Sequence, residues 1–340
     1  MTHRPSSKLT CGIFDHLDDD GRDIGRQYED RLILTEAYDR LGFYAYHVAE
    51  HCTPHGRGPS PGLFLSSVAQ RTRHLRLGPF VMLLNFCHPL RAFEEICMLD
   101  QLSGGRLELG LGRGGLPVEL SCFGVCEDAA PSRYEEANGI LLKTMMGGAL
   151  SYQGRHFQLN EVPLTLTTHQ RPSPPIWVTT NRLDTAIWAA GNGANLACVG
   201  PSVGVRKISD AYRTHRERSP CAPDRGAFVG LLRMVVIGRS ETDAYSLARS
   251  AYEQWLRSFK FLYELNDIPT PPALPLTFDA AIESELCVVG TPTPVRRLLL
   301  NQLEEAGANY LLCQLAFGNL PLDASLYAAR TIQSELLGHP

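Results

Sequence analysis

The sequence lacks four features that would each assign it to a narrower class. Its longest apolar runs are far too short to span a bilayer. With a formal net charge of −4 over 340 residues, the chain has no excess of basic residues that would bind nucleic acid. Its ten cysteines include no Cys-x-x-Cys pair. The polar stretch 1–8 is soon followed by Asp15 and Asp18, so no signal-peptide apolar region fits. We therefore expect a cytoplasmic, reduced protein that takes neither nucleic acid nor a membrane as a partner.

What is present is the composition of a large globular protein. Apolar residues make up 44% and charged residues 20% of the chain, and both values are ordinary for soluble domains. A chain of this length can bury a large core without disulfides. Its length by itself allows two domains, yet α/β barrels of this size are often one.

Short strand-like runs alternate with helical patterns along the chain. The eight predicted strands are 9–14, 43–50, 75–84, 106–111, 176–180, 196–199, 228–237 and 310–315. A helical pattern follows each strand, and the last two helices are predicted over 294–306 and 324–337. This alternation predicts a parallel sheet, and eight units predict a (β/α)₈ TIM barrel with insertions, formed by residues 1–340 as one domain. An open doubly wound sheet is the alternative.

Two long interruptions break this rhythm, at 147–174 and at 261–286, and the second contains a proline-rich run. Loops of this length inside compact domains are commonly functional or disordered. We therefore treat 261–286 as a candidate active-site lid, with a surface excursion of no function as the alternative.

The run Gly110-Leu-Gly-Arg-Gly-Gly115 fits the pattern G-x-G-x-x-G, which in a Rossmann fold places a pyrophosphate on a helix N-terminus. Its setting argues against that interpretation. Pro117 follows, no clear helix begins there, and the run lies in the fourth unit of the chain. We interpret it as the end of a barrel strand.

The run His47-Val-Ala-Glu-His51 fits the zinc-peptidase pattern H-x-x-E-H, which requires a helix. Here the preceding residues are typical of a strand. In a strand, residues four apart are separated by about 13 Å, too far for two imidazoles to share a zinc ion with bonds of about 2 Å. We expect no metal site. The strand instead places His51 at its C-terminal end, where the catalytic residues of barrels gather.

Three blocks of the sequence, in order and at similar spacing, resemble the bacterial luciferase-like flavin-dependent monooxygenase family. They run from Gly42-Phe43 to Glu50-His51, from Leu75-Arg-Leu-Gly78 to Arg113, and over Trp177–Ala190. The second block is long and specific, because it includes His88-Pro-Leu-Arg91 and the run from Leu99 to Arg113. The resemblance implies a TIM barrel that binds FMN at its C-terminal face.

The resemblance assigns residues to the cofactor site position by position. Arg113 matches the arginine that contacts the flavin phosphate, while Asn181, Arg182 and Thr185 match the phosphate-binding turn after the fifth strand. A guanidinium and the free N–H groups of a helix N-terminus suit a phosphate. These residues end or follow neighbouring strands, so they could bind one phosphate together.

The reactive end of the flavin is assigned in the same way. His51 matches the family's active-site histidine, as a hydrogen-bonding or acid–base group near the reactive edge. Phe80 and Val81 fall where relatives have a bulge beneath the isoalloxazine ring, in some of them with a cis peptide bond. Three departures leave the substrate open: Cys52 stands where many relatives have a second histidine, Gly112 stands where luciferase has a reactive cysteine, and Asn181, directly before Arg182, stands in place of an acidic residue. Light emission is not expected.

The resemblance therefore implies a two-component monooxygenase that acts on a small organic substrate. Reduced FMN would come from a separate flavin reductase, and oxygen would add at flavin C4a to give a (hydro)peroxide in a closed, dry pocket. One alternative is an F420-dependent dehydrogenase of the same fold, and another is a non-catalytic flavin-binding homologue. The family commonly dimerises, so a homodimer is expected.

Overall fold

The structure is a computed structural model, and it describes residues 9–51, 56–114, 116–219 and 227–338. Parallel strands form its centre in the order β3-β2-β1-β12-β10-β9-β8-β5-β4. The bounds of these strands are β1 Thr10–Asp15, β2 Ala45–Val48, β3 Arg76–Pro79, β4 Met82–Leu83, β5 Leu109–Gly112, β8 Ile176–Thr179, β9 Asn195–Cys198, β10 Val229–Ile237 and β12 Tyr310–Gln314.

The two ends of this sheet meet, so the strands form a barrel. Leu77 of β3 pairs in parallel with Leu107, just before β5, and β4 pairs with β5. Because β3 and β4 are two parts of one interrupted strand, the described residues provide eight strand positions around the barrel. The predicted (β/α)₈ barrel is confirmed.

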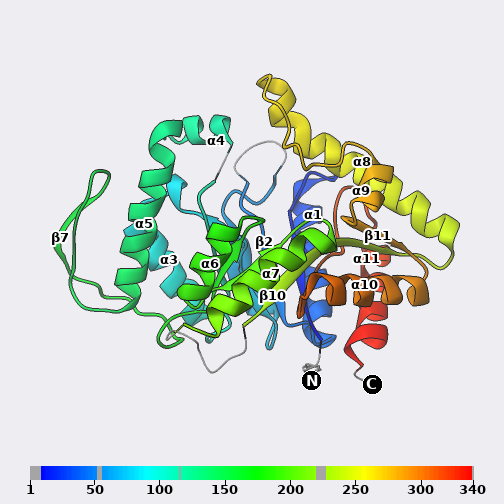
Figure 1. The fold of residues 1–340 in the computed structure, drawn as a ribbon, viewed down its shortest axis with the longest axis horizontal. Helices are drawn as coiled ribbons and strands as arrows, with labels where there is room; N and C mark the ends of the chain where they lie inside the picture. The colour runs from blue at the N-terminus through cyan, green and yellow to red at the C-terminus, as the bar shows by residue number, and fades with distance from the viewer. Residues whose placement is uncertain (1–8, 52–55, 115, 220–226, 339–340) are drawn as a thin grey trace.

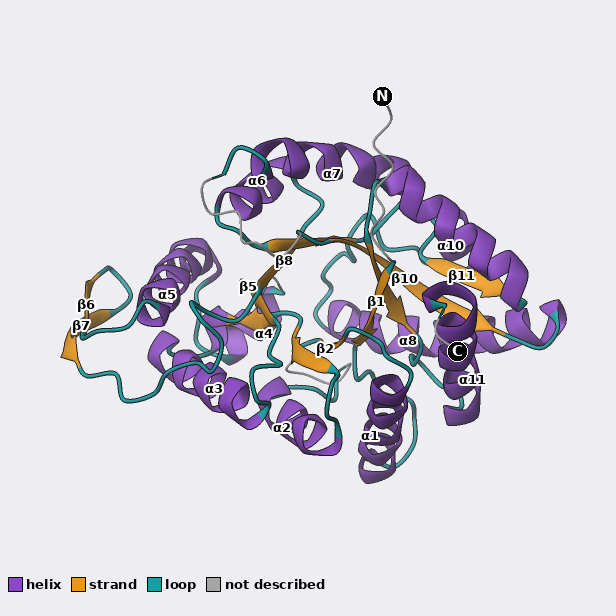
Figure 2. Ribbon diagram, turned by 90° about the horizontal axis from the view of Figure 1, so that it is seen from below, coloured by secondary structure: helices purple, strands orange, loops and turns teal. Residues whose placement is uncertain are grey.

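Helices surround the strands on the outside, as Figure 2 shows. The longer helices are α1 Ile24–Arg40, α2 Pro61–Arg71, α3 Pro89–Leu102, α5 Ala130–Met145, α6 Leu183–Gly191, α7 Ser202–Arg216, α8 Glu241–Leu265, α10 Pro292–Ala306 and α11 Leu322–Ile332. The short ones are α4 Pro117–Cys122, α9 Phe278–Glu283, the 3₁₀ turns η1 Leu84–Phe86 and η2 Glu127–Ala129, and the π-helical turn η3 Gln333–Leu337.

Local signals explain several of these helix starts. Proline stands in the first turn of α2, α3, α5 and α10, where its missing N–H would have no helical partner in any case. The side chain of Ser240 accepts a hydrogen bond from the Asp243 N–H at 3.2 Å and so caps α8. No helix in the described ranges is long and apolar enough to cross a membrane.

The barrel interior at the N-terminal ends of the strands contains a buried polar network around Glu108. This carboxylate accepts hydrogen bonds from Tyr44 Oη at 2.9 Å and from Trp177 Nε1 at 2.5 Å, and it pairs with Arg76. Burial raises the pKa of Glu108, and the charge of Arg76 opposes that rise. Because the carboxylate has both a cation and hydrogen-bond donors, it can be buried in the barrel at tolerable cost.

The structure differs from the sequence prediction at the insertions. Residues 147–174 contain an antiparallel hairpin, β6 Leu150–Gln153 with β7 Gln158–Val162, which projects beside α5 in Figure 1. A further strand, β11 Cys287–Gly290, pairs with the far end of β10. Helix α4 begins at Pro117, where we expected no helix. These elements contain four to six residues each, too few to show a clear periodicity.

The segment 261–286 is also more ordered than a loop. Helix α8 extends into it as far as Leu265, and α9 lies within it. Of this segment, Tyr263 lines the cavity described below. That the segment acts as a lid stays a prediction.

Candidate functional site

A cavity of about 890 Å³ opens at the C-terminal ends of the barrel strands. Its walls come from the residues that follow β2, β5 and β8, from the interruption between β3 and β4, and from α4, α5, α6 and α8. Figure 1 shows α4 and the C-terminal part of α8 at this same end of the barrel. Loops at this face hold the active sites of TIM barrels, so the cavity is the candidate active site.

One end of the cavity is cationic. Arg113 follows β5, is exposed, and lines the cavity. Within the described ranges its guanidinium forms no ion pair. Tyr134 of α5 lines the same region; burial raises its pKa, and the positive charge of Arg113 opposes that rise. This end therefore offers an uncompensated cation beside a hydroxyl, which suits an anion.

The first turn of α6 faces the same end. Arg182 and Thr185 line the cavity, as predicted for a phosphate-binding turn, and Asp184 lies between them. Its carboxylate accepts hydrogen bonds from Arg182 Nη2 at 2.5 Å and from the Thr185 N–H at 2.7 Å. These bonds hold the pKa of Asp184 well below its ordinary value. The chain's own carboxylate thus occupies the donors that a bound anion would use.

Asn181 is placed differently from the other predicted residues. Its amide donates to the Val199 carbonyl at 2.7 Å and accepts from the Val199 N–H at 3.2 Å. It lines a smaller neighbouring pocket of about 330 Å³, between the ends of β8 and β9. Asn181 therefore fixes the loop beside α6 and does not face the main cavity.

The floor of the cavity is the interruption of the third barrel strand. Phe80 and Val81, joined by a cis peptide bond, both line the cavity. Gly112 lies against them: a Cβ added there would be 2.1 Å from Val81 Cγ2. The two segments therefore pack without space for a side chain between them. The predicted positions of Phe80 and Val81 beneath a flat ligand are compatible with this geometry.

His51 and Glu50 follow β2, two barrel positions away from β5 and Arg113, and both line the cavity. Glu50 Oε2 accepts a hydrogen bond from the Leu83 N–H at 2.9 Å, which fixes it against the interrupted strand. Burial raises the pKa of Glu50 to about 7, with smaller additions from the charges of Glu95 and Glu119. This part of the cavity therefore holds a carboxyl group, Glu50, that can exchange protons near neutral pH, beside the imidazole of His51. Cys52, noted as a departure from the family pattern, lies outside the described residues.

The outer wall is a ladder of aromatic rings on α8. Trp255 stacks on Phe259 at 5.2 Å between ring centroids, and Phe259 stacks on Tyr263 at 5.7 Å. Residues four apart share one face of a helix, and Phe259 and Tyr263 line the cavity. The wall gives the cavity a second apolar surface besides the Phe80–Val81 floor.

Sequence reasoning missed several residues in or beside the site, among them His16, Glu50, Glu119, Tyr134, Asp184, Phe259 and Tyr263. The spacing of Trp255, Phe259 and Tyr263 is a detectable aromatic stripe, but such stripes more often pack in a core. His16 follows β1 directly, at a strand end where barrel active sites gather. The described residues contain no group of three or more His, Cys, Asp or Glu side chains arranged to hold a metal ion.

A closed barrel with this cavity at its C-terminal face defines a TIM-barrel protein with an enzyme-like site. Residues 10–310 match the sequence model of the luciferase-like monooxygenases. The chain therefore belongs to the luciferase-like monooxygenase family, as the resemblance in the sequence indicates.

Comparisons with individual proteins agree with this assignment. The chain is 68% identical over 332 residues to the uncharacterized protein y4wF of Sinorhizobium fredii, covering 97% of both chains. It is 28% identical to the oxygenase component of the flavin-dependent trigonelline monooxygenase of Acinetobacter baylyi, covering 69% of this chain and 67% of that one. The crystal structure of monooxygenase RslO1 from Streptomyces bottropensis superposes with a TM-score of 0.87 at 26% identity, covering 97% and 99% of the two chains.

Proposed function

We propose that this protein is the oxygenase component of a two-component flavin monooxygenase. It would take reduced FMN from a separate flavin reductase and transfer oxygen to a small organic substrate. The observation that carries the proposal is that one cavity joins the cation Arg113 to the Phe80–Val81 floor and to His51.

The residues present fit a flavin mononucleotide. Arg113 is a cation at one end with no ion pair among the described residues, and the first turn of α6 adds the guanidinium of Arg182 and the N–H and hydroxyl of Thr185. Together they provide a set of donors for a phosphate monoester. The floor at Phe80 and Val81 is apolar, as the face of a ring system requires. When bound, reduced flavin would supply the two electrons that activate oxygen.

The residues that follow β2 would supply the proton-transfer groups. In this proposal His51 positions or protonates the reacting oxygen, and the aromatic wall of Phe259 and Tyr263 excludes water from it. The substrate would lie between this wall and the flavin ring. The trigonelline relative is named as an oxygenase component, which supports a reductase partner for this chain as well. We further propose a cytoplasmic homodimer.

Spectroscopic titrations test the choice of cofactor. We expect reduced and oxidised FMN to bind, with riboflavin, which lacks the phosphate, weaker. Binding of F420 with no binding of FMN would assign the chain to the F420-dependent dehydrogenases of this fold. FMN binding without oxygen-dependent turnover of any substrate tested would favour a non-catalytic homologue.

An Arg113→Ala variant tests the placement of the phosphate. It removes a charge-assisted contact, so we expect FMN affinity to fall by about 1.5–3 kcal/mol. Riboflavin affinity should change little. The matched control is Arg155→Ala, because Arg155 is exposed on the turn of the β6–β7 hairpin, outside the cavity. Unchanged FMN affinity in the Arg113 variant would contradict the proposed site.

A further inference from the structure

His16 lies directly beside the proposed acid–base residue. It follows β1, and only 7% of its surface is exposed. Its ring centroid is 4.3 Å from that of His51, with the ring planes at 63°. Strands β1 and β2 are paired neighbours in the barrel, so the two histidines leave adjacent strand ends and meet edge to face.

His16 also contacts Phe14 of β1, at 6.0 Å between ring centroids, and the aromatic wall. Its ring lies 6.1 Å from Phe259 with the planes at 26°, and 6.3 Å from Trp255. Phe259 lines the cavity, and so does His51. His16 is therefore the ring that connects the proposed proton-transfer group to the surface on which the substrate would pack.

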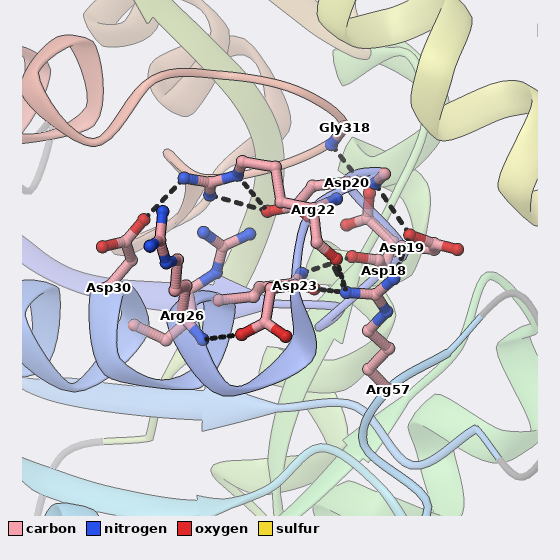
Figure 3. A network of polar contacts seen from close by, with 12 residues as sticks. Asp18, Asp19, Asp20, Arg22, Asp23, Arg26, Asp30, Arg57 and Gly318 are labelled. Atoms are coloured by element: carbon pink, nitrogen blue, oxygen red, sulfur yellow. Dashed lines mark hydrogen bonds and ion pairs between the residues drawn. The ribbon is translucent and has the colours of Figure 1, made fainter.

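The loop that carries His16 is held in place by a polar network, drawn in Figure 3. Asp18 Oδ2 accepts from the Gly318 N–H at 2.7 Å, which ties the loop to the segment after β12. Asp19 Oδ1 accepts from Arg57 Nη2 at 2.5 Å, which ties it to the segment beyond β2.

A second set of contacts attaches the same loop to its flanking helices. Gln27 of α1 donates through its side chain to the Asp18 carbonyl at 2.6 Å. Gln254 of α8 donates to the Asp19 carbonyl at 3.2 Å. The loop is thus fixed from four directions, and a ring on it can act as a rigid support.

From these contacts we infer that His16 is a positioning residue that fixes the imidazole of His51 and couples it to the α8 wall. This inference rests on the proposed function, in which His51 acts at the flavin. Removing the His16 ring leaves a gap beside His51, and the imidazole gains rotational freedom. A substrate packed against Phe259 would then no longer influence the position of His51.

The first test needs no cofactor. In protein with isotope-labelled histidine, the ring resonance of His51 is identified by its loss in His51→Ala. We expect His16→Ala to shift and broaden that resonance, and His16→Phe, which keeps an aromatic ring, to shift it less. His215→Ala on α7 is the control, since His215 is exposed outside the barrel face. An unchanged His51 resonance in His16→Ala would overturn the inference.

The second test is a double-mutant cycle on the reaction of bound reduced FMN with oxygen. Without substrate, the two electrons and two protons of reduced FMN pass to O₂, and oxidised FMN and hydrogen peroxide leave. We expect His51→Ala to change the rate of peroxide release by roughly 10- to 100-fold, the scale of misplaced catalytic groups. His16→Ala should cause a comparable change while FMN affinity stays the same.

The combined variant decides how His16 acts. We expect His16→Ala in the His51→Ala background to add little, because the group it positions is gone. Effects that simply multiply would show that His16 acts independently of His51 and would overturn the inference. If His51→Ala itself leaves the rate unchanged, the proposed role of His51 fails, and the resonance of His51 still decides whether His16 positions it.

Discussion

Two carboxyl groups at the C-terminal face are held where their charged forms are unfavourable. Asp18 is 1% exposed, and burial raises its pKa to about 7 against the opposing charge of Arg31 and the Gly318 N–H bond. Its second oxygen, Oδ1, has no hydrogen-bond partner. Glu50 reaches about the same pKa through burial. Near neutral pH both groups therefore lie close to their titration midpoints.

These shifts make folding stability depend on pH. The folded-state pKa of Asp18, about 7, lies above its ordinary value of 3.8. At pH values between these two, the native state therefore binds more protons than the unfolded state. The contribution of Asp18 to the free energy of unfolding therefore falls as pH rises from about 4 to about 7. Asp18→Asn removes this charge and keeps an oxygen for the Gly318 N–H.

We expect Asp18→Asn to reduce the loss of stability between pH 5 and pH 8 by roughly 1–4 kcal/mol, since one pKa unit corresponds to about 1.4 kcal/mol. Urea unfolding at the two pH values measures it. Asp210→Asn is the control, because Asp210 is an exposed carboxylate on α7 that pairs with Arg206. If the free energy of unfolding of Asp18→Asn falls between pH 5 and pH 8 by as much as that of the wild type, Asp18 is charged in the folded protein across this pH range.

At the scale of one element, the first turn of α6 binds its own carboxylate. Asp184 takes the hydrogen-bond donors of Arg182 and Thr185 that the proposed function assigns to the flavin phosphate. A phosphate must therefore displace Asp184, and it also meets the negative charge of that residue. In the proposed function this competition would weaken cofactor binding, which would suit a cofactor that is exchanged with a reductase.

An Asp184→Asn variant tests this competition. We expect FMN to bind roughly two- to fivefold more tightly, the scale of an exposed charge pair, with riboflavin affinity unchanged. Titration of both flavins gives the comparison within one variant. Equal tightening of both flavins, or weaker binding of FMN, would contradict a competing role for Asp184.

At the scale of the whole molecule, the barrel closes where the backbone of β3 meets the segment before β5. A Cβ placed on Gly78 would lie 1.5 Å from the Glu108 carbonyl oxygen. This clash is with backbone, so no side-chain rotation can relieve it. Closure of the barrel, and with it the position of the network around Glu108, therefore requires glycine at this point.

We expect Gly78→Ala to lower the free energy of unfolding by about 1–3 kcal/mol or more, the usual cost of overpacking. Gly139→Ala is the matched control: Gly139 lies within α5, a Cβ there would meet nothing within 4 Å, and replacing a helical glycine by alanine should be neutral or stabilising. Denaturant unfolding of both variants measures the difference. A Gly78 variant as stable as the control would show that the closure can adjust.

Much of this arrangement follows from local sequence. The eight strand–helix units could be predicted because periodicity and flanking Gly and Pro act over a few residues. Arg113, Arg182 and His51 line one cavity because the C-terminal ends of parallel strands meet at one face of a barrel. The short strand β11 could not be predicted, because its pairing depends on the far end of β10.

The sequence by itself determined the barrel, the family and the ends of the strands that carry the site. Only the tertiary structure decided what surrounds those ends. His16 contacts Phe259 across more than 240 residues of chain, and Asn181 turns to Val199 and away from the cavity. No local pattern encodes such contacts, because they depend on how separate loops and helices pack once the barrel has closed.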